Sequence, residues 1–154
     1  MVAVILILVS AISAAQAACE YKIDKMEMKT CKGEPINIWT LTGLGAEFTD
    51  NCDVLVKGCA KMHTDLQSVV SEYKAFKDGM EVSKGKYSIC GMTLFDTKFE
   101  CPLAKGKDFC ATKNWVTKVP KSLLSLAVGD IRSEVTLKTS EGVFCYVIKA
   151  TIRK

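Results

Sequence analysis

The chain has 154 residues, 49% of them hydrophobic and 25% charged, with a formal net charge of +4 at pH 7. Its lysines are spread along the chain rather than clustered, which is typical of a solvated, mildly basic surface and disfavours a nucleic-acid partner. Beyond the first residues no stretch reaches transmembrane length, and the remaining chain is long enough for one domain with a sizeable core.

The first segment, residues 1–17, has the features of a signal peptide. It carries no charged side chain, residues 2–9 form an apolar run, and residues 15–17 are an A-x-A cleavage pattern. A membrane anchor is the alternative, but polar residues interrupt the run before it reaches the roughly 20 residues that a spanning helix needs. We therefore expect a signal peptide over 1–17 and one domain over 18–154.

All eight cysteines lie after this leader. In a secreted chain the simplest use of eight cysteines is four disulfides. Zinc ligation is the alternative, but the cysteines are widely spaced and the chain has one histidine, so the pattern does not suit a zinc site.

Strand and turn signals dominate the chain after the leader. Residues 131–138 alternate apolar and polar side chains with period 2, and residues 54–59 and 69–76 are further predicted strands. Asp78-Gly79 predicts a hairpin turn after the third of these. Residues 143–152 are apolar on both faces, which predicts a strand buried between two layers. Turn signals recur roughly every ten residues, so we predict an all-β fold with two antiparallel sheets packed as a sandwich.

The sequence offers little for catalysis. The single histidine, His63, is expected to be solvated at a strand end, and the cysteines are expected in disulfides. Gly43-Leu44-Gly45 lacks the third glycine and the following helix of a nucleotide-binding loop. We predict that the protein is not an enzyme and that it has no cofactor and no metal site.

Two apolar features remain open to more than one interpretation. Aromatic residues in or beside the predicted strands fit either an ordinary sandwich core or the walls of a lipid-sized cavity. Residues 121–128 carry four apolar side chains between turn formers. This segment fits a lip that dips into a membrane or rims a pocket, and it also fits a short helix, over about residues 122–127, packed on the sandwich edge.

Several motifs together resemble one known family. They are Cys90, Cys-Pro-Leu-Ala-Lys-Gly at 101–106, Trp-Val-Thr-Lys-Val-Pro at 115–120, Gly-Asp-Ile-Arg at 129–132 and Phe-Cys-Tyr-Val-Ile at 144–148. With this spacing the chain resembles the ML (myeloid differentiation factor 2-related lipid-recognition) family, which includes the Niemann–Pick type C cholesterol carrier. The ganglioside activator protein has a similar pattern. The resemblance implies an immunoglobulin-like β-sandwich whose sheets part to enclose a lipid.

The resemblance also implies roles for particular residues. It places the disulfides Cys19–Cys145 and Cys90–Cys101, and we expect Cys31–Cys52 and Cys59–Cys110 for the other four cysteines on plausible reach alone. Leu123, Leu124 and Leu126 are expected to rim the entrance of the cavity. The expected cavity lining comes from alternating strand faces: Val56, Tyr73, Phe99, Trp115, Val135, Leu137, Phe144, Tyr146 and Ile148.

The function that follows is a secreted, non-catalytic protein that carries, extracts or presents a hydrophobic ligand such as a sterol, fatty acid or glycolipid. The alternative is a secreted protein–protein recognition module with a solid β-sandwich core. The expected partners are the lipid, a membrane contacted transiently and, for the alternative, a receptor protein. The chain has no N-x-S/T sequon, which favours an extracellular over a lysosomal location.

Overall fold

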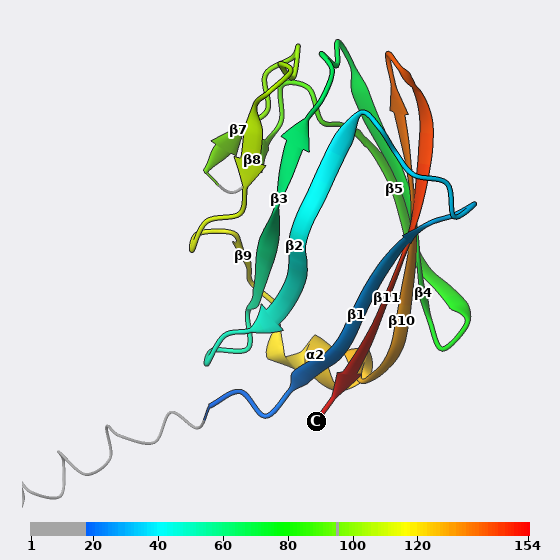
Figure 1. Ribbon diagram of the computed structural model, residues 1–154. Coiled ribbons are helices and arrows are strands. Elements are labelled where there is room, and N and C mark those ends of the chain that lie inside the picture. Colours follow the sequence, from blue (N-terminus) through cyan, green and yellow to red (C-terminus); the bar gives the residue numbers. More distant parts are fainter. Residues whose placement is uncertain (1–17, 95) are drawn as a thin grey trace, which may run out of the picture.

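The computed structural model describes residues 18–94 and 96–154, so the predicted signal peptide lies outside the described residues. Two antiparallel sheets form an immunoglobulin-like β-sandwich (Figure 1). The larger sheet contains, in spatial order, β1 (Lys22–Thr30), β11 (Gly142–Arg153), β10 (Gly129–Thr139), β4 (Val69–Lys77) and β5 (Met80–Ser88). The smaller sheet contains β2 (Trp39–Phe48), β3 (Val54–Met62) and β8 (Asp108–Cys110), and β9 (Val116–Thr117) also pairs with β3. The predicted all-β sandwich is confirmed.

Two short elements complete the fold. Strands β6 (Thr93–Leu94) and β7 (Thr97–Lys98) pair with each other as a separate two-stranded sheet. Helix α2 (Lys121–Ala127) follows β9 of the smaller sheet and precedes β10 of the larger one, so it spans the end of the sandwich from one layer to the other (Figure 1). The alternative of a short helix at this edge is therefore the one that the structure adopts.

The hairpin between β4 and β5 forms where the sequence predicted it. Lys77 pairs with Met80, and the two residues between them have positive φ, 48° at Asp78 and 85° at Gly79. Two successive residues with positive φ make the turn that joins twisted antiparallel strands without splaying them, and Asp-Gly is a favoured sequence for it.

Strand β11 differs from its prediction. It is a central strand of one sheet rather than a strand covered on both faces, and Val143 on its outer face is 66% exposed. Its inner face carries Phe144, Tyr146 and Ile148, while Cys145 on the outer face forms a disulfide with Cys31. In a two-layer sandwich each sheet has a second layer on one side only, so an apolar outer face can remain in solvent.

The four disulfides agree with the expected pairing in two cases. Cys90 is bonded to Cys101, and Cys59 to Cys110, whose positions are directly paired across β3 and β8.

The other two pairings were wrong. Cys31 is bonded to Cys145 and Cys19 to Cys52, not Cys19 to Cys145 and Cys31 to Cys52. The reason is the antiparallel pairing of β1 with β11. Cys31 follows the end of β1 beside Cys145, and its N–H donates to the Cys145 carbonyl at 3.0 Å. Cys19 precedes the opposite end of β1. At about 3.3 Å per residue, this strand separates its two ends by roughly 30 Å.

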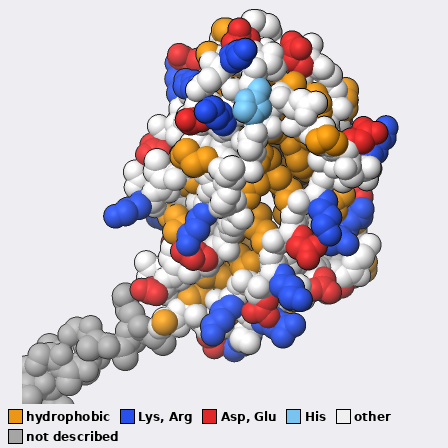
Figure 2. All heavy atoms as spheres, viewed as in Figure 1, with side chains coloured by type: hydrophobic (Ala, Val, Ile, Leu, Met, Phe, Trp, Pro, Cys, Tyr) orange, Lys and Arg blue, Asp and Glu red, His pale blue; other side chains and the backbone are white. Residues whose placement is uncertain are grey.

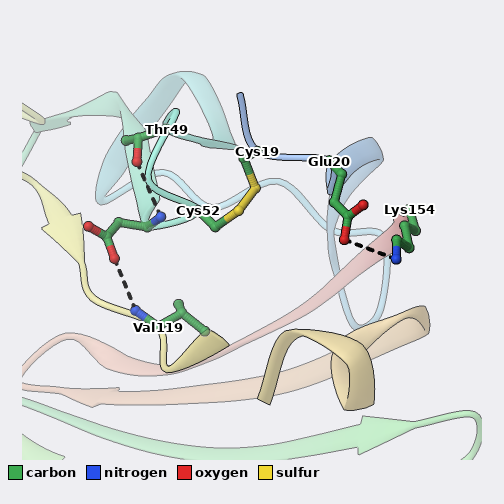
Figure 3. Close-up of a disulfide and its surroundings, with 7 residues drawn as sticks. Cys19, Glu20, Thr49, Cys52, Val119 and Lys154 are labelled. Carbon is green, nitrogen blue, oxygen red and sulfur yellow. Dashed lines mark hydrogen bonds and ion pairs between the residues drawn. A yellow bond between two sulfur atoms is a disulfide. The ribbon is translucent and has the colours of Figure 1, made fainter. Parts of the chain in front are cut away.

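At that end, Cys19 meets Cys52 in the connection between β2 and β3 (Figure 3). The Glu20 carboxylate forms an ion pair with Lys154 at 3.0 Å, and the Asp53 carboxylate accepts from the Val119 N–H at 3.3 Å (Figure 3). These contacts join the N-terminus, the β2–β3 connection, the segment before α2 and the C-terminus.

Candidate functional site

A cavity of about 260 Å³ lies between the two sheets and is open to solvent. β1 and β2 lie nearest the viewer in Figure 1. In the same view, Figure 2 shows apolar side chains lining a hollow between the two layers. The lining exposes no polar atom. Its residues are Met28, Trp39, Leu41, Ala60, Met62, Ile89, Phe99, Leu103, Phe109, Val135, Leu137, Tyr146 and Ile148.

Strand periodicity explains why these side chains meet. Val135 and Leu137 are two residues apart on β10, and Tyr146, directly paired with Val135 on β11, points to the same face. In the opposite sheet, Leu41 of β2 is paired with Ala60 of β3 in the same way. Each sheet therefore presents an apolar inner face to the space between them.

The indole nitrogen of Trp39 on β2 and the hydroxyl of Tyr146 on β11 meet between the two sheets. The Trp39 Nε1–H donates a hydrogen bond to the Tyr146 hydroxyl, and the two rings are stacked with centroids 6.4 Å apart. Burial raises the pKa of the Tyr146 hydroxyl above its ordinary value, because the phenolate loses hydration. The pair satisfies both polar groups, and only carbon surface is left toward the cavity.

A second aromatic group packs around Phe99. Its ring stacks on Phe109 at 5.2 Å and meets Trp115 edge-on at 6.4 Å. Phe99 and Phe109 are among the buried residues of the core, together with Trp39, Met62, Leu66, Val69, Leu103 and Tyr146. The core and the cavity therefore share residues, and the cavity is a gap in this packing rather than a separate pocket.

The structure places five of the predicted lining residues in the cavity wall: Phe99, Val135, Leu137, Tyr146 and Ile148. Phe144 and Trp115 pack against the core without lining the cavity. Val56 is paired with Ala46 on β2, and Tyr73 packs beside Tyr87 at 6.2 Å between ring centroids; neither lines the cavity.

The three leucines expected at the entrance have different surroundings from one another. Leu124 is 1% exposed and holds α2 against the sandwich, whereas Leu123 and Leu126 are 50% and 65% exposed. None of the three lines the cavity. The helical turn separates them because residues one and two positions apart do not share a face of a helix.

Sequence reasoning missed eight lining residues: Met28, Trp39, Leu41, Ala60, Met62, Ile89, Leu103 and Phe109. The alternation of Trp39 and Leu41 with two threonines was a period-2 signal that identifies β2. The lining residues outside long strands, such as Leu103, had no comparable local signal.

Outside the cavity, the groups to consider for catalysis or metal binding are the single histidine and the acidic and cysteine side chains. The His63 side chain is at the surface, just after β3, with its Nε2 2.6 Å from the Thr40 hydroxyl. Within residues 18–94 and 96–154, no group of three or more His, Cys, Asp or Glu side chains is placed to hold a metal ion. In the same residues, no helix has the length and hydropathy to cross a membrane.

Comparisons with known proteins give a distant structural likeness and no match in sequence. No protein-family model matches the chain, and no curated protein matches it. Among solved structures, the chain is similar to chicken MD-1 complexed with lipid IVa, with 11% sequence identity and a TM-score of 0.44 over 84% of this chain and 94% of that chain.

Proposed function

We propose that this protein is a secreted, non-catalytic carrier of a hydrophobic ligand of the lipid class, held between the two sheets. The observation that carries the proposal is the wholly apolar cavity that is open to solvent. A water-filled cavity needs polar partners, and these walls provide none, whereas an apolar ligand gains from leaving water. Burying about 250 Å² of ligand surface is worth roughly 6 kcal/mol before the costs of association.

The size of the cavity favours a single-chain ligand. At about 260 Å³ it is just below the roughly 300–1,000 Å³ that is usual for small-molecule pockets. Two of the four disulfides tie the strands that build it: Cys31–Cys145 joins the end of β1 to β11 in the larger sheet, and Cys59–Cys110 joins β3 to β8 in the smaller one. Such a disulfide-rich chain suits an oxidising, extracellular compartment.

Ligand binding is tested with the purified protein by native mass spectrometry and by titration with the apolar dye N-phenyl-1-naphthylamine. We expect a bound apolar molecule or, after delipidation, saturable dye binding at one site. A protein that shows neither a ligand adduct nor saturable dye binding would contradict the proposal and support the alternative of a solid recognition module.

We also propose that α2 is where the protein contacts a membrane transiently. Leu123 and Leu126 project into solvent from this short helix, and the neighbouring Lys118 and Lys121 are exposed and make no ion pair in the described part of the chain. Apolar side chains beside cations suit an anionic lipid surface. The double variant Leu123→Ser, Leu126→Ser should lose sedimentation with vesicles containing phosphatidylglycerol and keep its dye affinity. Unchanged sedimentation would exclude this contact.

A further inference from the structure

The outer face of the larger sheet carries the net positive charge of the protein. Ten lysine and arginine residues and six acidic residues occupy outer-face positions of its five strands, counting Asp24 in the β1 bulge. Their net charge of +4 equals the formal net charge of the whole chain, so the remaining charges balance. The alternation of side chains along strands therefore gathers on one face cations that are spread along the sequence.

Five of these cations form a continuous row across the five strands. In spatial order from β1 to β5, the row consists of Lys25, Lys149, Arg132, Lys74 and Lys84. Arg132 is directly paired with Lys149 across β10 and β11. Lys74 is directly paired with Lys84 across β4 and β5. The other two steps of the row, from β1 to β11 and from β10 to β4, are diagonal. At about 4.8 Å between neighbouring strands, the row extends over roughly 19 Å.

This row destabilises the folded chain rather than stabilising it, because like charges in directly opposed positions repel. The acidic residues of the face already have partners on it: five are in ion pairs with its lysines and arginines, and Asp130 accepts from the Thr151 hydroxyl at 2.8 Å. Among the described residues, Lys25, Lys74 and Lys149 are exposed and make no ion pair. The row therefore has positive charge that the fold does not neutralise.

An open groove follows the middle of the row. Two hollows of about 450 and 270 Å³ share Arg132 and Lys149 in their linings, and together they extend from β1 to β4. The Arg132 guanidinium lies over the Phe76 ring, 5.4 Å from its centroid, and it forms an ion pair with Glu134. These contacts orient the guanidinium, whose planar fork of N–H donors suits the oxygens of an anionic group.

The lining of this groove favours a sulfated polysaccharide over a bilayer or a nucleic acid. None of its apolar side chains is among the exposed ones, whereas binding to a lipid surface places apolar side chains in the bilayer. Arg132 covers the ring of Phe76, the aromatic residue in the lining, so unpaired bases would find no free ring to stack on. The four disulfides suit an extracellular compartment, where sulfated polysaccharides are abundant linear polyanions.

We propose that this row of five cations is a docking surface for a sulfated polysaccharide. Successive sulfates lie along the row and neutralise its two directly opposed like-charge pairs. A single exposed ion pair contributes up to about fivefold to affinity, so several sulfates of one chain act together. The row is on the outer face of the larger sheet and the cavity is on its inner face, so this inference goes beyond the carrier function and does not depend on it.

The test measures binding of a fluorescently labelled heparin hexasaccharide to the purified protein at physiological salt. The variant Lys74→Gln, Lys149→Gln removes two cations of the row, and we expect it to weaken binding about fivefold or more. Because this variant also relieves like-charge repulsion, its free energy of unfolding in urea should be no lower than that of the wild type. The matched control Lys61→Gln, Lys113→Gln makes the same change in net charge at exposed lysines on β3 and in the β8–β9 connection, and it should keep the wild-type affinity.

Several outcomes would overturn the proposal. Equal weakening by both double variants would show that net charge alone accounts for binding, and a wild-type protein that does not bind heparin would exclude the surface outright. Equally tight binding of chemically desulfated heparin would remove the requirement for sulfate. Tighter binding of single-stranded DNA, or of vesicles containing phosphatidylglycerol, through Lys74 and Lys149 would assign the row to another partner. The affinity of Lys74→Gln, Lys149→Gln for N-phenyl-1-naphthylamine should be unchanged, which separates failure of this proposal from failure of the carrier function.

Discussion

Filling the cavity from its smallest lining side chain distinguishes an open sandwich from a solid one. Ala60 lies on β3, paired with Leu41, and its methyl group contributes to the cavity wall. Ala60→Phe adds six carbon atoms, about 100 Å³ at protein packing density, which is slightly more than a third of the 260 Å³ available. The ring therefore fits into existing space.

The expected effects on stability and on binding have opposite signs. Cavity volume costs about 24 cal/mol per Å³, so filling about 100 Å³ should raise the free energy of unfolding by up to roughly 2 kcal/mol. The ring occupies the ligand's place, so dye affinity should fall at least about tenfold, the equivalent of 1.4 kcal/mol.

Urea denaturation followed by tryptophan fluorescence measures the first effect, and titration with N-phenyl-1-naphthylamine measures the second. Ala104→Phe is the control, because Ala104 is exposed and outside the cavity, and it should change neither quantity. In a solid core, the same Ala60→Phe change would overpack and destabilise by about 1–3 kcal/mol and leave dye binding as it was. That combination would refute the reasoning.

Three further predictions concern the Trp39–Tyr146 pair and the Cys31–Cys145 disulfide. Trp39→Phe removes the donor to the Tyr146 hydroxyl and should cost about 1–3 kcal/mol of unfolding free energy; adding Tyr146→Phe should recover part of this cost, and strictly additive losses in urea denaturation would contradict the coupling. Burial raises the pKa of the Tyr146 hydroxyl in the folded protein. The contribution of this group to the free energy of unfolding is therefore complete below the ordinary tyrosine pKa of 10.0, and it is lost as the pH rises through the pKa of the folded state. Stability should therefore fall above about pH 10 in the wild type and less steeply in Tyr146→Phe; parallel pH profiles would exclude this assignment. Replacing both Cys31 and Cys145 by Ala opens a loop with a sequence separation of 114 and should cost about 5 kcal/mol; a loss below about 2 kcal/mol in urea denaturation would show that the disulfide does not restrain the unfolded chain.

Local sequence patterns were sufficient for part of the fold. The alternation over residues 131–138 and the Asp78-Gly79 turn predicted β10 and the β4–β5 hairpin, because side-chain period and turn geometry depend only on neighbours in the chain. The same patterns did not show that β11 has an exposed outer face, since the number of layers that cover a strand is not a local property.

Most of the predicted lining residues that lie in the cavity wall are on strongly patterned strands. Val135, Leu137, Tyr146 and Ile148 are of this kind, and Phe99, expected from the family resemblance, is the fifth. Tyr73 is paired with Val135 on the inner face and does not line the cavity. Leu124 was expected at the entrance but is buried, because a seven-residue helix turns one of its leucines inward and the others outward.

Composition, side-chain period and turn residues act locally, so they were enough to predict an all-β, disulfide-rich chain with short antiparallel strands and few candidate catalytic groups. Tertiary structure alone decided which cysteines pair, since the antiparallel pairing of β1 with β11 puts Cys31, not Cys19, beside Cys145. It also decided that the apolar inner faces leave a cavity between the two sheets. The size of this cavity depends on how far apart the two sheets pack, and that distance is set by all of their side chains together.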